Sequence, residues 1–176
     1  MEIYGNLETA TLGGGCFWCI EAVMRTLPAV ERIRSGMSGG VHTNKGQAEV
    51  VQVEFDNSKM SYLNILKAFF TAHDPTQINR QGADVGEEYR TIILYHSEEQ
   101  KKTAEVLISY LTENKVFPAK IQTEVEKYDS FREASEGHQN YFEKNKGNSH
   151  CNVVIQPKID KFLKNFKPEQ WAVNDA

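Results

Sequence analysis

The sequence has few cysteines, few prolines and no long hydrophobic run, and each shortage excludes a class of protein. Three cysteines in 176 residues are too few for a domain held together by disulfides, and the number is odd. No apolar run approaches the roughly 20 residues that span a bilayer. The first residues lack a basic and an apolar segment, so we expect no signal peptide. These features favour a cytoplasmic, reducing location and leave the use of the three thiols to be explained.

The charge balance and the length narrow the class further. With 20 basic and 24 acidic residues the net charge is -4, whereas a nucleic-acid-binding protein needs a basic face to neutralise phosphates. We therefore expect no nucleic-acid partner and no membrane partner. A chain of this length can bury one substantial core, so residues 1–176 are expected to form a single domain that acts as a monomer.

Apolar periodicity predicts alternating strands and helices. The fold class expected from this order is α+β, a two-layer sandwich with a ferredoxin-like (split βαβ) core and a coil-rich C-terminal segment over about 144–176. Residues 144–152 are polar and turn-rich. The predicted strands cover 9–13, 30–38, 48–55, 91–95 and 121–125, and the predicted helices cover 17–27, 61–72, 97–113, 131–141 and 157–166.

The junction between the first strand and the first helix has the composition of a nucleophile site. Cys16 comes where the helix begins, so free amides and the helix dipole favour a thiolate and a low pKa there. Phe17 and Trp18 beside it offer an aromatic surface on which a methyl group or a thioether packs well. The alternative is that Cys16 and both aromatic residues simply belong to the core. The segment reads Gly13-Gly14-Gly15-Cys16-Phe17-Trp18-Cys19.

Three further residues are candidates for the same site. Glu49 shares a strand face with Val51 and Val53, where burial would raise the pKa of its carboxyl into the range of a general acid. A solvated strand end is an equally good interpretation of Glu49. Asp84 and Tyr89 lie in a glycine-containing loop before a central strand, where polar site residues are common, although a turn residue and a core aromatic explain them as well.

Cys16 and Cys19 form a Cys-x-x-Cys pair, which has two other possible uses. A zinc site needs a second pair of ligands, and His138 and His150 are too far apart in the sequence to supply it, so we expect no metal. A thioredoxin-like redox pair remains open, and so does an inert, buried Cys19.

An ordered series of motifs resembles the A-type peptide methionine sulfoxide reductases, over about residues 9–157. A late cysteine, Cys151, follows the last of them. The motifs are Gly15-Cys16-Phe17-Trp18, Gly46-Gln47-Ala48-Glu49, His73-Asp74-Pro75-Thr76-Gln77, Arg80-Gln81-Gly82-Ala83-Asp84, Tyr89-Arg90 and Glu136-Gly137-His138-Gln139-Asn140-Tyr141.

The resemblance implies an enzyme of protein repair under oxidative stress that acts on methionine-S-sulfoxide, free or in proteins. It implies that Cys16 attacks the sulfoxide sulfur and becomes a sulfenic acid while Glu49 protonates the oxygen. It further implies that Cys151 resolves the sulfenic acid to a Cys16–Cys151 disulfide, which thioredoxin reduces without a cofactor.

The family pattern also assigns the substrate contacts. Asp84 and Tyr89 are implied to hold the sulfoxide oxygen, and Phe17 and Trp18 to enclose the methyl group. The loop over residues 41–45 is shorter than usual for the family and lacks its tyrosine, for which His42 is a possible substitute, and Gln47 stands where the family usually has histidine.

Two rival functions remain from the residues alone. One is a dithiol-disulfide oxidoreductase that uses Cys16 and Cys19, with no need for Cys151. The other is a module that binds methionine sulfoxide or senses redox state without converting a substrate.

Overall fold

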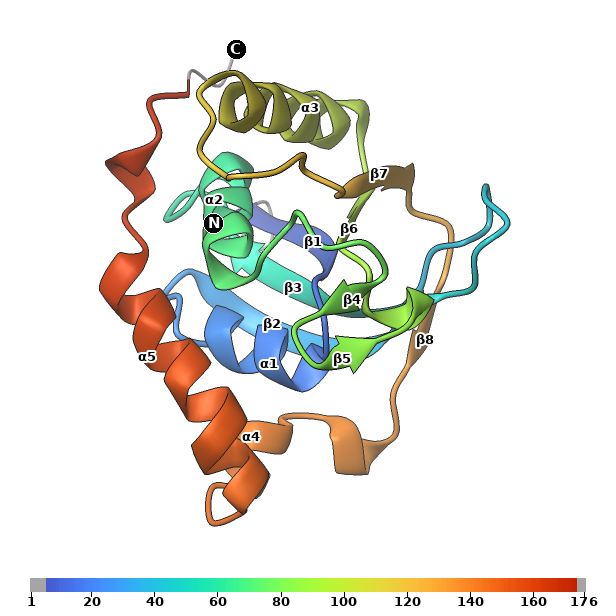
Figure 1. Ribbon diagram of the computed structural model, residues 1–176, viewed down its shortest axis with the longest axis vertical. Coiled ribbons are helices and arrows are strands. Elements are labelled where there is room, and N and C mark those ends of the chain that lie inside the picture. The colour runs from blue at the N-terminus through green and yellow to red at the C-terminus, as the bar shows by residue number, and fades with distance from the viewer. Residues whose placement is uncertain (1–5, 174–176) are drawn as a thin grey trace.

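The computed structural model describes residues 6–173. Its elements alternate along the chain as strands and helices (Figure 1). The strands are β1 (Leu7–Gly13), β2 (Val30–Ser38), β3 (Ala48–Asp56), β4 (Arg80–Gln81), β5 (Asp84–Val85), β6 (Ile92–Tyr95), β7 (Glu124–Lys127) and β8 (Phe131–Glu133). The helices are α1 (Phe17–Met24), α2 (Tyr62–Ala72), α3 (Glu98–Glu113), α4 (Tyr141–Lys144) and α5 (Gln156–Asn165), with a π-helical turn over Cys151–Ile155.

A six-stranded mixed sheet with the order β7-β6-β1-β3-β2-β8 forms the centre of the fold. Its neighbours pair antiparallel except β6 and β7, which are parallel. In the register of the central pair Ala10 lies opposite Val53 and Leu12 opposite Val51. The prediction of a mixed α and β protein is confirmed.

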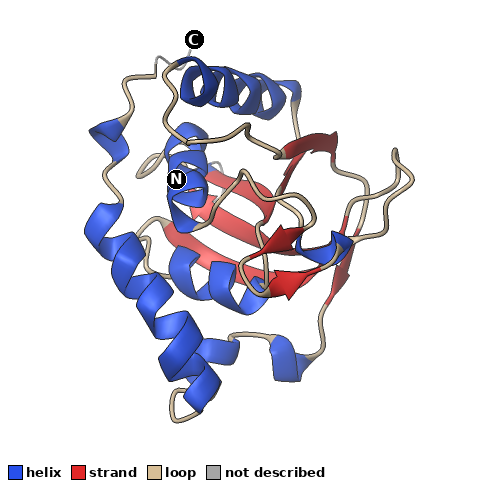
Figure 2. Ribbon diagram, viewed as in Figure 1, coloured by secondary structure: helices blue, strands red, loops and turns tan. Residues whose placement is uncertain are grey.

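Both faces of the sheet are covered. Val51, Val53 and Phe55 face the large core, which helices α1, α2, α3 and α5 complete, and Figure 2 shows helices over this side of the strands. Ala48 and Val50 face the opposite side, together with Ile92 and Leu94 of β6 and the partly buried side chains of Tyr128 and Phe131. This alternation has the period of two of a strand, and β6 is also buried on both faces, with Ile93 in the large core and Ile92 and Leu94 on the other side.

Polar caps explain where two helices begin. The Ser61 hydroxyl accepts a hydrogen bond from the Asn64 N–H at 3.1 Å, and the Ser97 hydroxyl accepts one from the Gln100 N–H at 3.2 Å. These bonds satisfy amides that the helix itself leaves unpaired. Helix α1 ends at Met24, before the predicted Leu27, because the N–H groups of Thr26 and Leu27 bond to carbonyl oxygens three residues back and form turns.

Two elements near the C-terminus differ from the prediction. The helix predicted over 131–141 is wrong, because Phe131–Glu133 instead forms strand β8 on the free edge of β2, with Ser38 opposite Phe131. The backbone groups at that sheet edge give this segment a partner that its local sequence does not show. The strand predicted over 121–125 is shifted to Glu124–Lys127, because its parallel ladder with β6 starts at the Ile92–Glu124 pair.

A buried carboxylate attaches the C-terminal segment to α1. The Glu21 side chain is only 2% exposed and accepts hydrogen bonds from the Ser35 hydroxyl, the Asn140 backbone N–H and the Arg25 guanidinium at 2.7 to 3.0 Å. The Gln139 side chain adds bonds to both backbone groups of Ser35. Glu21 therefore joins α1, β2 and the start of α4 at one point.

We expect Glu21→Gln to lower the free energy of unfolding by about 1–3 kcal/mol, because the amide nitrogen would face donors that need an acceptor. Urea denaturation measures this loss. Glu31→Gln, at an exposed position of β2, is the matched control, with an expected change within about 0.5 kcal/mol. Equal stability of the two variants would contradict the role assigned to Glu21.

Candidate active site

Cys16 lies at the N-terminus of α1, directly after the glycine turn that follows β1. It is the N-cap residue with an extended backbone (φ -61°, ψ 128°), and its carbonyl oxygen accepts bonds from the N–H groups of Cys19 and Ile20. The thiol is partly exposed, as a nucleophile must be. The predicted position at the start of a helix is confirmed.

The glycines before Cys16 allow neighbouring backbones to approach closely. A Cβ on Gly13 would lie 2.7 Å from the Glu49 carbonyl oxygen, and a Cβ on Gly15 would lie 2.8 Å from the Gln81 side chain. Gly15 also has a φ of +95°, which other residues rarely adopt. The turn therefore requires glycine at both positions.

Glu49, on β3, faces the start of α1. Its Oε1 atom accepts a hydrogen bond from the Phe17 N–H at 3.0 Å, so the carboxylate satisfies one of the free amides of the helix. Burial raises the pKa of this carboxyl, the Phe17 hydrogen bond opposes the rise, and the charges of Glu88 and Asp84 add to it. The predicted direction of the Glu49 pKa is confirmed.

Asp84 and Tyr89 reach the same place from the segment between α2 and β6. Asp84 is in β5, and Tyr89 ends the 3-10 helix Glu87–Tyr89. Burial raises the pKa of Tyr89, and the nearby charges of Glu49, Asp84 and Cys16 raise it further. The fold thus brings together four of the predicted residues: Cys16, Glu49, Asp84 and Tyr89.

Buried Arg90 fixes the segment that carries Tyr89. Its guanidinium donates to the carbonyl oxygens of Glu87 and Gly46, both at 2.9 Å, and forms an ion pair with Glu124 at 3.3 Å. One side chain thus connects the 3-10 helix, the start of β3 and strand β7.

The two aromatic residues after Cys16 differ in their surroundings. Phe17 is 9% exposed and belongs to the core, whereas Trp18 stacks on Tyr141 with ring centroids 3.7 Å apart and an interplanar angle of 6°. The His138 ring also lies near Trp18, at 5.7 Å. Both partners come from the motif Glu136–Tyr141, which sequence reasoning did not connect with Trp18 because nothing local relates the two segments.

The prediction of a low pKa for Cys16 is wrong. The hydrogen bond from its thiol to Cys19, burial and the charge of Cys19 raise the pKa of Cys16. The same hydrogen bond, aided by Lys158 and opposed by burial, lowers the pKa of Cys19 to about 7. At this helix N-terminus Cys19 therefore ionises more readily than Cys16, and its partner Lys158 was not found from the sequence.

Cys151 lies against this pair in the core. It starts the π-helical turn, is 0% exposed and belongs to the same hydrophobic cluster as Cys19. The prediction of a coil-rich segment over about 144–176 is therefore wrong for residues 151–165, which are helical because Cys151, Ile155, Ile159 and Phe162 pack inward on one side. Burial, and next the charge of Cys19, raise the pKa of Cys151.

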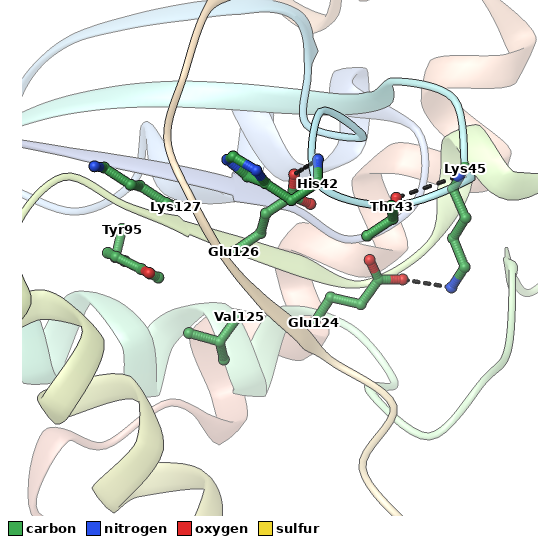
Figure 3. A pocket seen from close by; sticks show the side chains of 8 residues that line it. All are labelled: His42, Thr43, Lys45, Tyr95, Glu124, Val125, Glu126 and Lys127. Atoms are coloured by element: carbon green, nitrogen blue, oxygen red, sulfur yellow. Dashed lines mark hydrogen bonds and ion pairs between the residues drawn. The ribbon is translucent and has the colours of Figure 1, made fainter.

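His42 lies at a different hollow. The loop over 41–45 projects beside β7, where it borders an open hollow of about 650 Å³ (Figure 3). The backbone N–H of His42 donates to Glu126, and Lys45 pairs with Glu124 at 2.6 Å. His42 thus replaces no site tyrosine here. The lining residues are His42, Thr43, Lys45, Tyr95, Glu124, Val125, Glu126 and Lys127.

Residues 6–173 contain no group of three or more His, Cys, Asp or Glu side chains that could hold a metal ion. Over the same residues, no helix has the length and apolar character needed to cross a membrane.

Two neighbouring thiols beside a carboxyl of raised pKa are typical of enzymes that use thiol chemistry. Residues 8–171 match the family described as peptide methionine sulfoxide reductase. The protein named peptide methionine sulfoxide reductase MsrA from Natronomonas pharaonis is 48% identical over 90% of this chain and 94% of its own length. The protein of the same name from Sulfolobus acidocaldarius is 48% identical over 95% of this chain and 99% of its own.

Solved structures give the same result. The crystal structure of Mxr1 from Saccharomyces cerevisiae in reduced form is similar with a TM-score of 0.73 and 27% identity, over 84% of this chain and 90% of that one. Methionine sulfoxide reductase A of Corynebacterium diphtheriae is similar with a TM-score of 0.67 and 26% identity, over 80% of this chain and 76% of that one. The chain belongs to the peptide methionine sulfoxide reductase family.

We expect Glu49→Gln to lower kcat/KM for methionine sulfoxide by about 10²–10⁴-fold, because the amide cannot donate a proton as a carboxyl does. For the unchanged protein we expect activity to fall as the pH rises through the raised pKa of Glu49, where the acid form is lost. The variant lacks this part of the pH profile. Glu54→Gln, on the opposite face of β3, is the control, and equal profiles for the two variants would refute the acid role.

The raised pKa of Glu49 also affects the stability of the protein. A carboxyl whose pKa is raised by folding stabilises the protein below its ordinary pKa, and this contribution is lost as the pH rises through the folded pKa. We therefore expect the difference in the free energy of unfolding between Glu49→Gln and the unchanged protein to shift in favour of the variant between pH 4 and pH 8. Denaturation at both pH values measures the change.

Proposed function

We propose that this chain reduces methionine-S-sulfoxide, free or in proteins, to methionine. The observation that carries the proposal is the contact between Glu49 and the Phe17 N–H, since it holds a carboxyl of raised pKa at the start of the helix that carries Cys16. A sulfoxide is a poor electrophile until its oxygen accepts a proton, so the reaction needs an acid and a sulfur nucleophile side by side.

The reaction follows from the roles of these groups. Glu49 gives its proton to the sulfoxide oxygen while the Cys16 sulfur attacks the substrate sulfur, drawing on the negative charge that Cys16 and Cys19 share. The oxygen is transferred to Cys16, which becomes a sulfenic acid, and methionine leaves. Asp84 and Tyr89 hold the oxygen, and Phe17 and Trp18 enclose the methyl group.

Cys151 completes the proposed cycle. It forms a disulfide with Cys16, the oxygen leaves as water, and thioredoxin reduces the disulfide by exchange. Mxr1 from Saccharomyces cerevisiae, which resembles this chain at 27% identity in its reduced form, has also been crystallised in complex with Trx2. No step needs a cofactor.

We also propose that the chain acts as one catalytic domain with a ferredoxin-like, split βαβ core. The strand order β6-β1-β3-β2 and the helices that follow β1 and β3 support this description. A cytoplasmic location suits the chemistry, because the cycle starts from free thiols and a reducing compartment maintains them.

We expect Cys16→Ser to release no methionine above background, because a hydroxyl cannot take the place of the sulfur nucleophile. Chromatography of methionine after incubation with methionine sulfoxide and dithiothreitol measures this. Full activity of the variant would contradict the proposal.

Cys151→Ser should release about one methionine per enzyme and then stall in thioredoxin-driven cycles, since the disulfide that thioredoxin reduces is not formed. Steady turnover of this variant with thioredoxin would remove the resolving role of Cys151.

A further inference from the structure

Cys19 is the thiol that the cycle above leaves without a step of its own. It lies in the first turn of α1, is 5% exposed and shares a hydrogen bond with the Cys16 thiol. On its other side the Lys158 Nζ atom donates a hydrogen bond to the Cys19 sulfur at 3.5 Å. Lys158 belongs to α5, which runs along α1 (Figure 1). A buried thiol held between a second thiol and a cation has the surroundings of a reactive cysteine.

The spacing of Cys16 and Cys19 suits a disulfide. Residues three apart at the start of a helix lie about 5–6 Å from each other, within the Cα separation that a disulfide spans. Cys151 comes from a separate segment, the π-helical turn, and its side chain is fully buried. Oxidised Cys16 therefore meets Cys19 first, without any movement of the chain.

The environment of Cys19 favours its thiolate form. Its pKa is about 7, lowered by the Cys16 hydrogen bond and by Lys158, and raised by burial and the charge of Asp84. Cys151 faces it from the π-helical turn. A cavity of about 510 Å³ adjoins Cys19 and Lys158, and its other titratable lining residues are His73, Asp74 and Lys161.

We propose that Cys19 is the first resolving cysteine, positioned by Lys158, and that it passes the oxidation on to Cys151. This inference rests on the proposed reduction of methionine sulfoxide by Cys16. The Cys19 thiolate attacks the sulfur of the Cys16 sulfenic acid, the sulfur–oxygen bond breaks, and hydroxide leaves with a proton as water. The product is a Cys16–Cys19 disulfide.

The second step moves the disulfide. The Cys151 thiolate attacks the Cys16 sulfur, a Cys16–Cys151 disulfide forms, and Cys19 leaves as a thiolate stabilised by Lys158, since a thiol of lower pKa is the better leaving group. The order of the steps follows from the charges. Burial and the Cys19 charge raise the pKa of Cys151, and the first disulfide removes that charge, so Cys151 ionises more readily afterwards.

The test uses the Cys151→Ser protein, which arrests the cycle before the second step. One equivalent of methionine sulfoxide is added without reductant, dimedone is present to trap sulfenic acid, and the peptides are mapped by mass spectrometry. We expect about one equivalent of methionine and a Cys16–Cys19 disulfide. In Cys19→Ser/Cys151→Ser we expect methionine with a dimedone adduct on Cys16.

The other outcomes of this experiment overturn either the inference alone or the proposed function as well. Methionine release from Cys151→Ser with a dimedone adduct on Cys16 and a free Cys19 thiol overturns the inference and leaves the proposed function intact. Absence of methionine release from both variants refutes the proposed function and the inference together.

The role of Lys158 is tested by a pH profile, which a merely structural role would not move. In the Cys151→Ser background, Lys158→Gln should slow formation of the Cys16–Cys19 disulfide at pH 7 by about three- to tenfold, because less thiolate is present. The difference should vanish at high pH, and Lys158→Arg should restore the rate. Lys164→Gln, in the last turn of α5, is the matched control. A Lys158→Gln profile equal to that control refutes the positioning role.

Discussion

The arrangement of the site depends on one hydrogen bond, from the Phe17 N–H at the start of α1 to the Glu49 carboxylate on β3. The first amides of a helix have no partner within the helix, and Glu49 supplies one. Gly13 lets the two backbones come close enough, because any side chain there would collide with the Glu49 carbonyl oxygen. Close main-chain packing and one hydrogen bond from a helix amide thus hold the Glu49 carboxyl at the start of the helix that carries Cys16.

Burial favours the reactive form of Glu49 but disfavours the reactive form of Cys16. It raises the pKa of Glu49, which favours the acid form. The hydrogen bond to Cys19, together with burial, raises the pKa of Cys16, which opposes formation of the nucleophile. The ionised form is favoured instead at Cys19, where the Cys16 hydrogen bond and Lys158 lower the pKa. A thiolate can form in this buried site, near the acid, because Lys158 of α5 donates a hydrogen bond to the Cys19 sulfur.

Prediction from the sequence was most accurate where interactions between neighbouring residues determine the structure. Strand β2 was expected over 30–38 and observed there, and the Ser97 cap was recognisable from its own turn. Prediction failed for residues 131–141, where a helical pattern yields to pairing with the edge of β2. At the site, Cys16 and Glu49 could be found because a cysteine at a helix start and a carboxyl on an apolar strand face are unusual. Lys158 could not, because it is one ordinary lysine on an amphipathic helix.

The sequence by itself determined the class of fold, the motifs of the family and the identity of the residues with reactive chemistry. Only the tertiary structure decided the protonation of the thiols and the place of the C-terminal segment. The reason is physical: pKa values and docking depend on burial and on charges from elements distant in the chain. Glu21 holding Asn140, and Lys158 beside Cys19, join residues more than a hundred positions apart, and such contacts exist only in the folded molecule.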